Sequence, residues 1–117
     1  METFGEKMKA LRKAKRITQR DLADLVGVDF TYISKMENGK LINAPAEETI
    51  RKIARVLEID ADEFVVAARK VPKTIQETIV NDDFVVNFLR VAPRLDAYQR
   101  EQIKAIIDNK GGKDEEK

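Results

Sequence analysis

Apolar residues recur every three or four positions along most of the chain. Phe4, Met8 and Leu11 follow this spacing near the N-terminus, and Ile50 and Ile53 follow it further on. Residues spaced in this way lie on one face of an α-helix, whereas a half-buried strand needs strict alternation of apolar and polar residues, which does not persist anywhere in the sequence. The pattern therefore predicts an all-α protein built from short amphipathic helices.

Capping signals divide the first half of the chain into five helices. Thr3 with Glu6, and Thr18 with Asp21, fit the capping box, in which two side chains three positions apart bond to each other's backbone N–H. Gly27 suits the left-handed residue that commonly follows a helix. We expect helices over residues 4–15, 19–26, 30–37, 46–57 and 61–70, with Asp29 and Asp60 as the N-caps of the third and fifth.

Pro72 marks a boundary, because proline disfavours a helix through the preceding residue and suits the first position of a new one. Beyond it, the apolar spacing and the break at Pro93 indicate three further short helices, over residues 72–80, 83–91 and 97–110. The terminal sequence GGKDEEK is too polar to pack, so we expect it to be disordered. The predicted organisation is a domain over residues 1–70, a short helical extension over 71–110 and a disordered tail over 111–117.

The residue types that are missing narrow the range of functions. The chain has no Cys and no His, which excludes disulfides and thiolate metal sites and removes the commonest general base. Ser34 is the only serine and has no recognisable base as a partner, so we expect no enzyme, no metal and no cofactor. No apolar stretch approaches the roughly 20 residues of a membrane span. The N-terminus lacks the apolar core of a signal peptide, and we expect a cytoplasmic protein that does not bind membranes.

The net charge of +1 conceals an uneven distribution. Residues 1–55 carry 12 Lys and Arg against 8 Asp and Glu, and residues 56–117 carry 10 against 13. Residues 7–20 contain seven basic side chains and no acidic one. A local positive field of this kind favours a polyanionic partner, although the same run would also suit an ordinary solvated helix face.

The stretch 17–40, ITQRDLADLVGVDFTYISKMENGK, is the most informative part of the sequence. Ala23 is small enough for the next helix to pack closely, and Gly27 permits the positive φ that a tight turn between helices needs. Val28 and Ile33 are placed to bury the junction. The third helix would then be held rigidly with its opposite face outward, and a helix presented in this way fits the major groove of DNA.

The same stretch resembles the lambda-repressor/Cro-type helix-turn-helix domain, also called the XRE family. The resemblance covers roughly residues 4–66, and about a dozen spaced positions carry it. They are Thr18-Gln19, Leu22-Ala23, Val26-Gly27-Val28, Ile33-Ser34 and Glu37-Asn38-Gly39, followed by Glu48-Thr49-Ile50, Ile53-Ala54, Leu57 and Phe64. The resemblance implies a five-helix lambda-repressor-like DNA-binding domain.

The resemblance also implies roles for residues on and around the third helix. Phe30, Thr31 and Lys35 align with base-reading positions: Lys35 suits guanine O6 and N7, Thr31 suits several bases, and Phe30 suits a thymine methyl. As an alternative, Phe30 or Tyr32 turns back and packs on neighbouring helices, and Lys35 is an ordinary solvated lysine. The resemblance assigns contacts to the DNA backbone, or secondary contacts to DNA, to six further residues: Thr18, Gln19, Tyr32, Ser34, Asn38 and Lys40.

Other positions near the motif receive structural or general roles. Glu37 is expected to pair with a basic side chain or cap a helix. The basic residues of the first helix are expected to add general attraction to DNA, although only some of them can face it because they point around the helix. They are Lys9, Arg12, Lys13, Lys15 and Arg16. The loop over residues 40–45 departs from the family by about two extra residues and contains the apolar Leu41 and Ile42, which we expect to pack under the loop or to help a dimer contact.

The extension is more apolar than short isolated helices need to be, and we expect it to mediate dimerisation. A single helix-turn-helix unit reads only a few base pairs, and pairing lets such proteins read two half-sites about one DNA turn apart. Ordinary packing within the chain, or binding of an effector or partner, would explain the same residues. The predicted dimer contacts are Phe84, Val85, Phe88, Leu89, Ile103, Ile106 and Ile107.

Together these features predict a sequence-specific transcriptional regulator that binds double-stranded DNA. The leading hypothesis is a homodimeric repressor that covers a short palindromic operator and blocks polymerase. The alternative is a protein-interaction module, of an antitoxin or adaptor type, built on the same scaffold.

Overall fold

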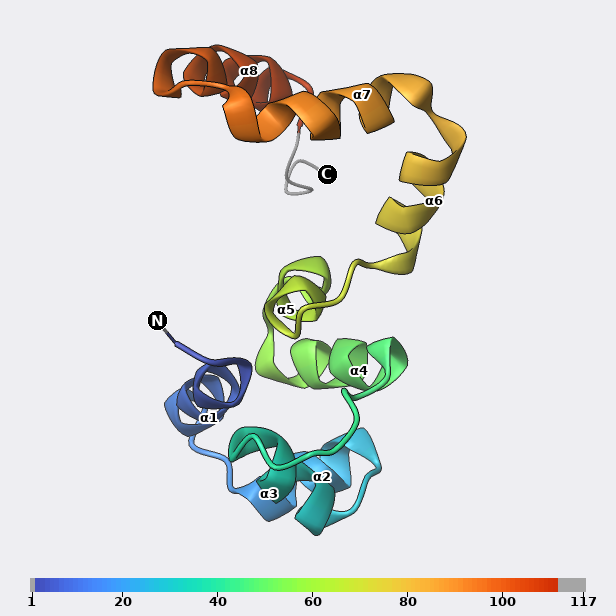
Figure 1. Cartoon of the computed structure of the whole chain (residues 1–117). Coiled ribbons are helices and arrows are strands. Elements are labelled where there is room, and N and C mark those ends of the chain that lie inside the picture. Colours follow the sequence, from blue (N-terminus) through green and yellow to red (C-terminus); the bar gives the residue numbers. More distant parts are fainter. Residues whose placement is uncertain (1, 112–117) are drawn as a thin grey trace. The chain divides into compact units, whose positions relative to one another are not determined.

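In a computed structural model, which describes residues 2–111, the chain is all-helical and contains no strand within that range (Figure 1). This confirms the predicted fold class, including the five-helix domain and the helical extension. In chain order the elements are α1 (Phe4–Ala14), α2 (Gln19–Val26), α3 (Phe30–Glu37), α4 (Glu47–Leu57), α5 (Ala61–Ala67), α6 (Lys73–Asn81), α7 (Asp83–Val91), the 3₁₀ turn η1 (Ala92–Arg94) and α8 (Ala97–Asn109).

The predicted caps start the helices. Thr3 and Thr18 form complete capping boxes with Glu6 and Asp21 at the starts of α1 and α2. The carboxylate of Asp29 accepts a hydrogen bond from the Thr31 N–H at the start of α3. Four further α-helices begin after an N-cap residue: α4 after Ala46, which makes no side-chain bond, and α5, α7 and α8 after Asp60, Asp82 and Asp96, which each accept a backbone N–H.

Two predicted boundaries near residue 70 are wrong. Helix α5 ends at Ala67 instead of residue 70, and Arg69 adopts a left-handed conformation with φ of 64°. The Lys70 N–H turns back to the carbonyl of Val65, which closes the helix. Pro72 is buried and precedes α6 instead of forming its first residue, and its carbonyl accepts the Gln76 N–H.

Side chains from α1 to α5 form one hydrophobic core. The rings of Phe4 and Phe64 lie 4.7 Å apart between centroids, which joins α1 to α5. Gly5 has no room for a side chain, because a Cβ there would lie 2.3 Å from the carbonyl oxygen of Glu37. The buried apolar residues are Met8, Leu22, Ala23, Val26, Ile33, Met36, Ile50, Ile53, Ala54, Leu57, Phe64 and Val65.

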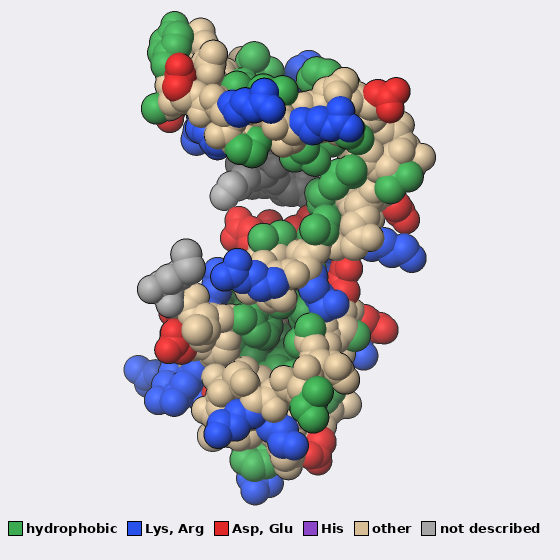
Figure 2. Space-filling model, in the orientation of Figure 1, with side chains coloured by type: hydrophobic (Ala, Val, Ile, Leu, Met, Phe, Trp, Pro, Cys, Tyr) green, Lys and Arg blue, Asp and Glu red, His purple; other side chains and the backbone are tan. Residues whose placement is uncertain are grey.

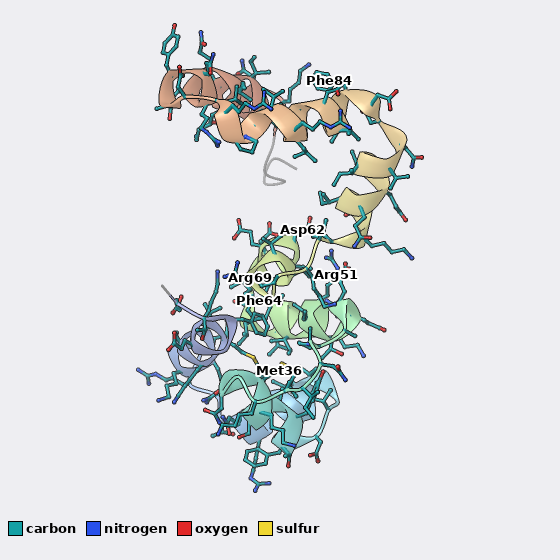
Figure 3. The ribbon with its side chains drawn as sticks, viewed as in Figure 1. Met36, Arg51, Asp62, Phe64, Arg69 and Phe84 are labelled. Atoms are coloured by element: carbon teal, nitrogen blue, oxygen red, sulfur yellow. The ribbon has the colours of Figure 1, made fainter. Side chains whose placement is uncertain are left out.

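A small ionic network connects α4 to α5 and to the start of α6. The Nε of Arg51 lies 2.9 Å from Glu47 Oε2, and its Nη2 lies 2.7 Å from Asp62 Oδ1 (Figure 3). The backbone N–H of Lys73 also donates to the Glu47 carboxylate, at 3.2 Å. The hydrogen bond from Arg51, reinforced by the Lys73 N–H and opposed by partial desolvation, lowers the pKa of Glu47 below its ordinary value.

The chain divides into two compact units between Gln76 and Glu77, within α6. The first, unit 1, holds α1 to α5 and the start of α6; the second, unit 2, holds the rest of α6 with α7, η1 and α8. The sequence places its domain boundary slightly earlier, between residues 70 and 71. Apart from residue 111, the predicted disordered tail lies outside the described residues. No described helix combines the length and apolarity that a membrane crossing requires.

Candidate nucleic-acid interface

The turn between α2 and α3 is built as the sequence predicts. Gly27 ends α2 in the left-handed conformation, with φ of 84°, and its N–H donates to the carbonyl of Ala23 at 2.8 Å. The next N–H, that of Val28, donates to the same carbonyl at 3.0 Å. Asp29 then caps α3. Because the turn is only three residues long and its backbone bonds are closed, α3 is fixed at a defined angle to α2.

The two faces of α3 have different environments. Ile33, Met36 and Glu37 are buried against the rest of unit 1. Thr31 and Lys35, two of the predicted base-reading residues, are exposed. A helix that is anchored along one face and carries a hydroxyl and an amine on the other is able to enter the major groove and offer both groups to base edges.

Phe30, Tyr32 and Ser34 are half-buried rather than fully outward. Phe30 and Tyr32 both pack against the edge of the hydrophobic core. Their side chains therefore help to hold α3 in place while part of each surface remains accessible. Both roles considered from the sequence, anchoring and DNA contact, are compatible with this position.

Four of the predicted backbone or secondary contacts lie at or near the start of α2 and the end of α3. The hydroxyl of Thr18 accepts the Asp21 N–H within its capping box, and Gln19 is the first residue of α2. Asn38 is the C-cap of α3, and Lys40 is exposed two residues later. In Figure 2, Lys and Arg side chains gather on the end of unit 1 that Figure 1 shows to contain α2 and α3.

A buried ion pair ties the motif to α1. Arg12 Nε lies 2.7 Å from Glu37 Oε2, and the side chains of Arg12 and Glu37 are 8% and 0% exposed. Arg12 also donates to the carbonyl of Ile17 at 2.8 Å, and Gln19 Nε2 donates to Glu37 Oε1 at 3.0 Å. Glu37 therefore has the structural role that the sequence predicts, as the partner of a basic side chain.

The prediction that Arg12 adds general attraction to DNA is wrong, because its charge is neutralised inside the protein. A sequence signal was present: Arg12 lies four residues after buried Met8, and Glu37 lies four residues after buried Ile33, so both occupy the inward stripes of their helices. Lys15 is also engaged, with its Nζ 2.6 Å from Glu58 Oε1. Lys9, Lys13 and Arg16 are exposed.

The structure also reveals a stacked pair that the sequence analysis did not identify. The guanidinium carbon of Arg20, on α2, lies 4.4 Å from the centre of the Phe30 ring, on α3. In the loop after α3, only one of the two apolar residues packs under the loop. Leu41 packs against the core, whereas Ile42 is 98% exposed.

Unit 2 carries the residues predicted to mediate dimerisation. Of these, Phe84, Leu89, Ile106 and Ile107 are exposed, and Val85, Phe88 and Ile103 are half-buried. Helices α6, α7 and α8 contain no fully buried residue among their described positions. Phe84, at the start of α7, is 76% exposed (Figure 3).

No group of three or more Asp or Glu side chains among the described residues is arranged to hold a metal ion. The arrangement offers binding surfaces: a rigid helix with a polar face, backbone N–H groups and cations around its ends, and apolar side chains on unit 2.

The fold and the α2–α3 geometry define a helix-turn-helix domain, and the family described as helix-turn-helix matches residues 8–64. The chain belongs to the lambda-repressor/Cro-type (XRE) helix-turn-helix family of transcriptional regulators. No solved structure is significantly similar to this chain.

Several curated proteins are similar to the same region. The chain is 36% identical over 80 residues to the uncharacterised HTH-type transcriptional regulator RghRB of Bacillus subtilis (strain 168), a match that covers 66% of this chain and 57% of RghRB. It is 44% identical over 59 residues to the transcriptional repressor RghR of that organism, which covers 50% of this chain and 43% of RghR. The transcriptional activator BcrR of Enterococcus faecalis is 37% identical over 62 residues, which covers 53% of this chain and 29% of BcrR. The chain thus spans about half the length of RghRB and RghR.

Proposed function

We propose that this protein is a transcriptional regulator that binds duplex DNA by inserting α3 into the major groove. The observation that carries this proposal is the two-sided burial of α3: Ile33, Met36 and Glu37 anchor it, and Thr31 and Lys35 remain exposed. The Lys35 amine suits guanine O6 and N7, and the Thr31 side chain offers a hydroxyl and a methyl group. Phe30 adds an apolar edge suited to a thymine methyl.

Contacts to phosphates would fix the helix in the groove. The Gln19 amide nitrogen carries two N–H groups, and Glu37 accepts one of them. The second N–H of Gln19, together with the free backbone N–H groups at the start of α2, is then available to a phosphate. Thr18, Asn38 and Lys40 lie at neighbouring helix ends, and Tyr32 and Ser34 lie beside the base-reading residues on α3, so these side chains supply secondary contacts.

The dimer is proposed to form through unit 2. This unit has about 40 residues, a size at which isolated folded units commonly depend on oligomerisation. Its helices bury no residue completely, and Phe84 and Ile106 are largely exposed. Pairing with a second copy would cover these side chains and place two α3 helices on successive turns of DNA, about 34 Å apart.

Repression is the proposed regulatory outcome, with the bound dimer covering a promoter. The similarity to RghR, which is named a repressor, supports this direction. The similarity to the activator BcrR supports the opposite outcome, in which the bound protein contacts polymerase and a promoter assay shows activation.

The experiment that tests the proposal is a fluorescence-anisotropy titration of the purified chain with labelled duplex DNA at several salt concentrations. Binding through phosphate contacts should weaken linearly on a logarithmic plot against salt, with a slope of about −0.9 per phosphate neutralised. A chain that bound no duplex but formed a tight complex with one other protein would instead support the adaptor-type alternative.

A further inference from the structure

The cation of Arg20 is held over the ring of Phe30 at the exposed junction of α2 and α3. The guanidinium carbon lies 4.4 Å from the ring centre, within the range of a cation–π contact. Arg20 is the second residue of α2 and is exposed, and Phe30 is the first residue of α3 and is half-buried. The pair therefore links the start of α2 to the start of α3.

The guanidinium of Arg20 is not used elsewhere in the described part of the chain. Asp24 stands four residues further along α2, at the spacing of a helix ion pair, yet no ion pair or hydrogen bond of Arg20 occurs within residues 2–111. Arg12, by contrast, commits its donors to Glu37 and Ile17. The contact with the Phe30 ring uses none of the N–H groups of Arg20 as a hydrogen-bond donor, so these groups remain free to donate.

The Arg20 guanidinium and the Phe30 ring are separated by a distance of the same order as the spacing of DNA bases. The guanidinium carbon lies 4.4 Å from the ring centre, and neighbouring base pairs are about 3.4 Å apart along the helix. An arginine edge suits guanine O6 and N7, and an apolar ring suits a thymine methyl. Two side chains stacked in this way would therefore meet two successive base pairs, one group to each.

We propose that Arg20 is a specificity-determining residue, which reads a guanine on the base pair next to a thymine contacted by Phe30. In this proposal Phe30 holds the Arg20 guanidinium in position and also contacts a thymine itself. This inference rests on the proposed DNA-binding function and adds α2 to the base-reading surface. It also explains why Phe30 is half-buried: a ring that is packed at one edge gives the arginine a fixed platform.

The experiment uses the duplex that the full-length chain prefers when selected from a randomised pool. Each guanine near the centre of a half-site is replaced in turn by 7-deazaguanine, which lacks the N7 acceptor, and each thymine by uracil, which lacks the methyl group. Affinities are measured for the wild type and for Arg20→Ala, Arg20→Lys and Phe30→Leu. Arg55→Lys, on the exposed part of α4, is the matched control.

We expect Arg20→Ala to lower affinity for the preferred duplex by about 10- to 100-fold, the usual range for losing one bidentate base contact. Arg20→Lys should lower it by a smaller factor, because an amine can still donate to guanine but lacks the planar fork of the guanidinium. The loss caused by Arg20→Ala should be smaller on the duplex that carries 7-deazaguanine at one particular position, because only guanine O6 remains there to accept a hydrogen bond. Phe30→Leu should weaken the effect of uracil at the adjacent position, because leucine offers a smaller apolar surface. It should also weaken the effect of that 7-deazaguanine, because leucine has no aromatic ring to face Arg20. Arg55→Lys should behave as the wild type.

Two results would overturn the inference in different ways. If Arg20→Lys binds as tightly as the wild type, and Arg20→Ala weakens binding to every sequence equally, Arg20 contacts a phosphate and does not read a base. The proposed function survives that result when Lys35→Ala still changes base preference. If the wild-type chain binds no duplex at all, the proposed function and this inference fail together.

Discussion

Arg12 on α1 and Glu37 at the end of α3 form a buried ion pair, with Nε and Oε2 2.7 Å apart. Glu37 also accepts the side-chain amide of Gln19, so one carboxylate connects α1, α2 and α3. Removing one member of a buried pair leaves the other charge without a partner in a dry environment, which commonly costs 3–5 kcal/mol. The pair therefore holds the helix-turn-helix motif on α1.

We predict that Arg12→Ala lowers the free energy of unfolding in urea by about 3–5 kcal/mol. The matched control is Glu58→Gln, which breaks the exposed pair with Lys15 and should leave the unfolding midpoint almost unchanged. The double replacement Arg12→Met with Glu37→Leu should lose less stability than Arg12→Ala, because no buried charge remains. Equal midpoints for Arg12→Ala and Glu58→Gln would contradict the structural role of the pair.

Gly5 provides a second test of how α1 meets α3. A Cβ at this position would lie 2.3 Å from the backbone oxygen of Glu37, and a backbone atom cannot move aside as a flexible side chain would. Gly5→Ala should therefore destabilise the protein by about 1–3 kcal/mol, as overpacked cores do, even though alanine favours helices more than glycine does. Lys9→Ala, exposed on α1, is the control. If Gly5→Ala instead stabilised the protein against urea, α1 and α3 would have to lie further apart than they do in the structure.

Lys35 and Gln19 are predicted to affect DNA binding in different ways. Lys35→Ala should relax the preference at one base position by about 1–3 kcal/mol in gel shifts against operator variants. Gln19→Ala should weaken binding to all variants to a similar extent, because a phosphate contact carries no sequence information. The role of Lys35 in base reading would be rejected if Lys35→Ala also weakened every variant equally.

The apolar residues of unit 2 lead to a prediction about the mass of the protein in solution. Phe84 is 76% exposed, and a charge there would oppose its burial in an interface between two copies. Sedimentation equilibrium should give a dimer for the wild type and a monomer for Phe84→Asp. Ile42→Asp, at the 98% exposed loop position in unit 1, should remain dimeric. A monomeric wild type, or dissociation by Ile42→Asp alone, would contradict an interface formed by unit 2.

Local signals in the sequence were sufficient for most of the fold. The capping boxes at Thr18 and Thr3 and the left-handed Gly27 depend on residues a few positions apart, so their geometry follows from the local sequence. The end of α5 was predicted too late, because no helix-breaking residue occurs before Pro72 and the turn at Arg69 depends on a conformation that arginine rarely adopts.

The parts of the site that were missed join residues far apart in the chain. The Arg12–Glu37 pair spans 25 positions, and the contact of Arg20 with Phe30 depends on the angle between α2 and α3. Periodicity places Arg12 and Glu37 on the inward stripes of their helices, but it does not show that these two stripes meet, or that Arg20 lies against Phe30. The chemistry of the exposed positions Thr31 and Lys35 was accessible from sequence because the motif fixes which face of α3 is buried.

Selection of bound duplexes from a randomised pool, using the full-length chain, tests the central claim most directly. If the outer face of α3 reads DNA and the chain pairs, the enriched sequences will share a palindrome whose half-sites lie about 10 base pairs apart, centre to centre. Thr31 and Lys35 variants should enrich altered half-sites. A pool that shows no sequence preference after repeated rounds would contradict the account.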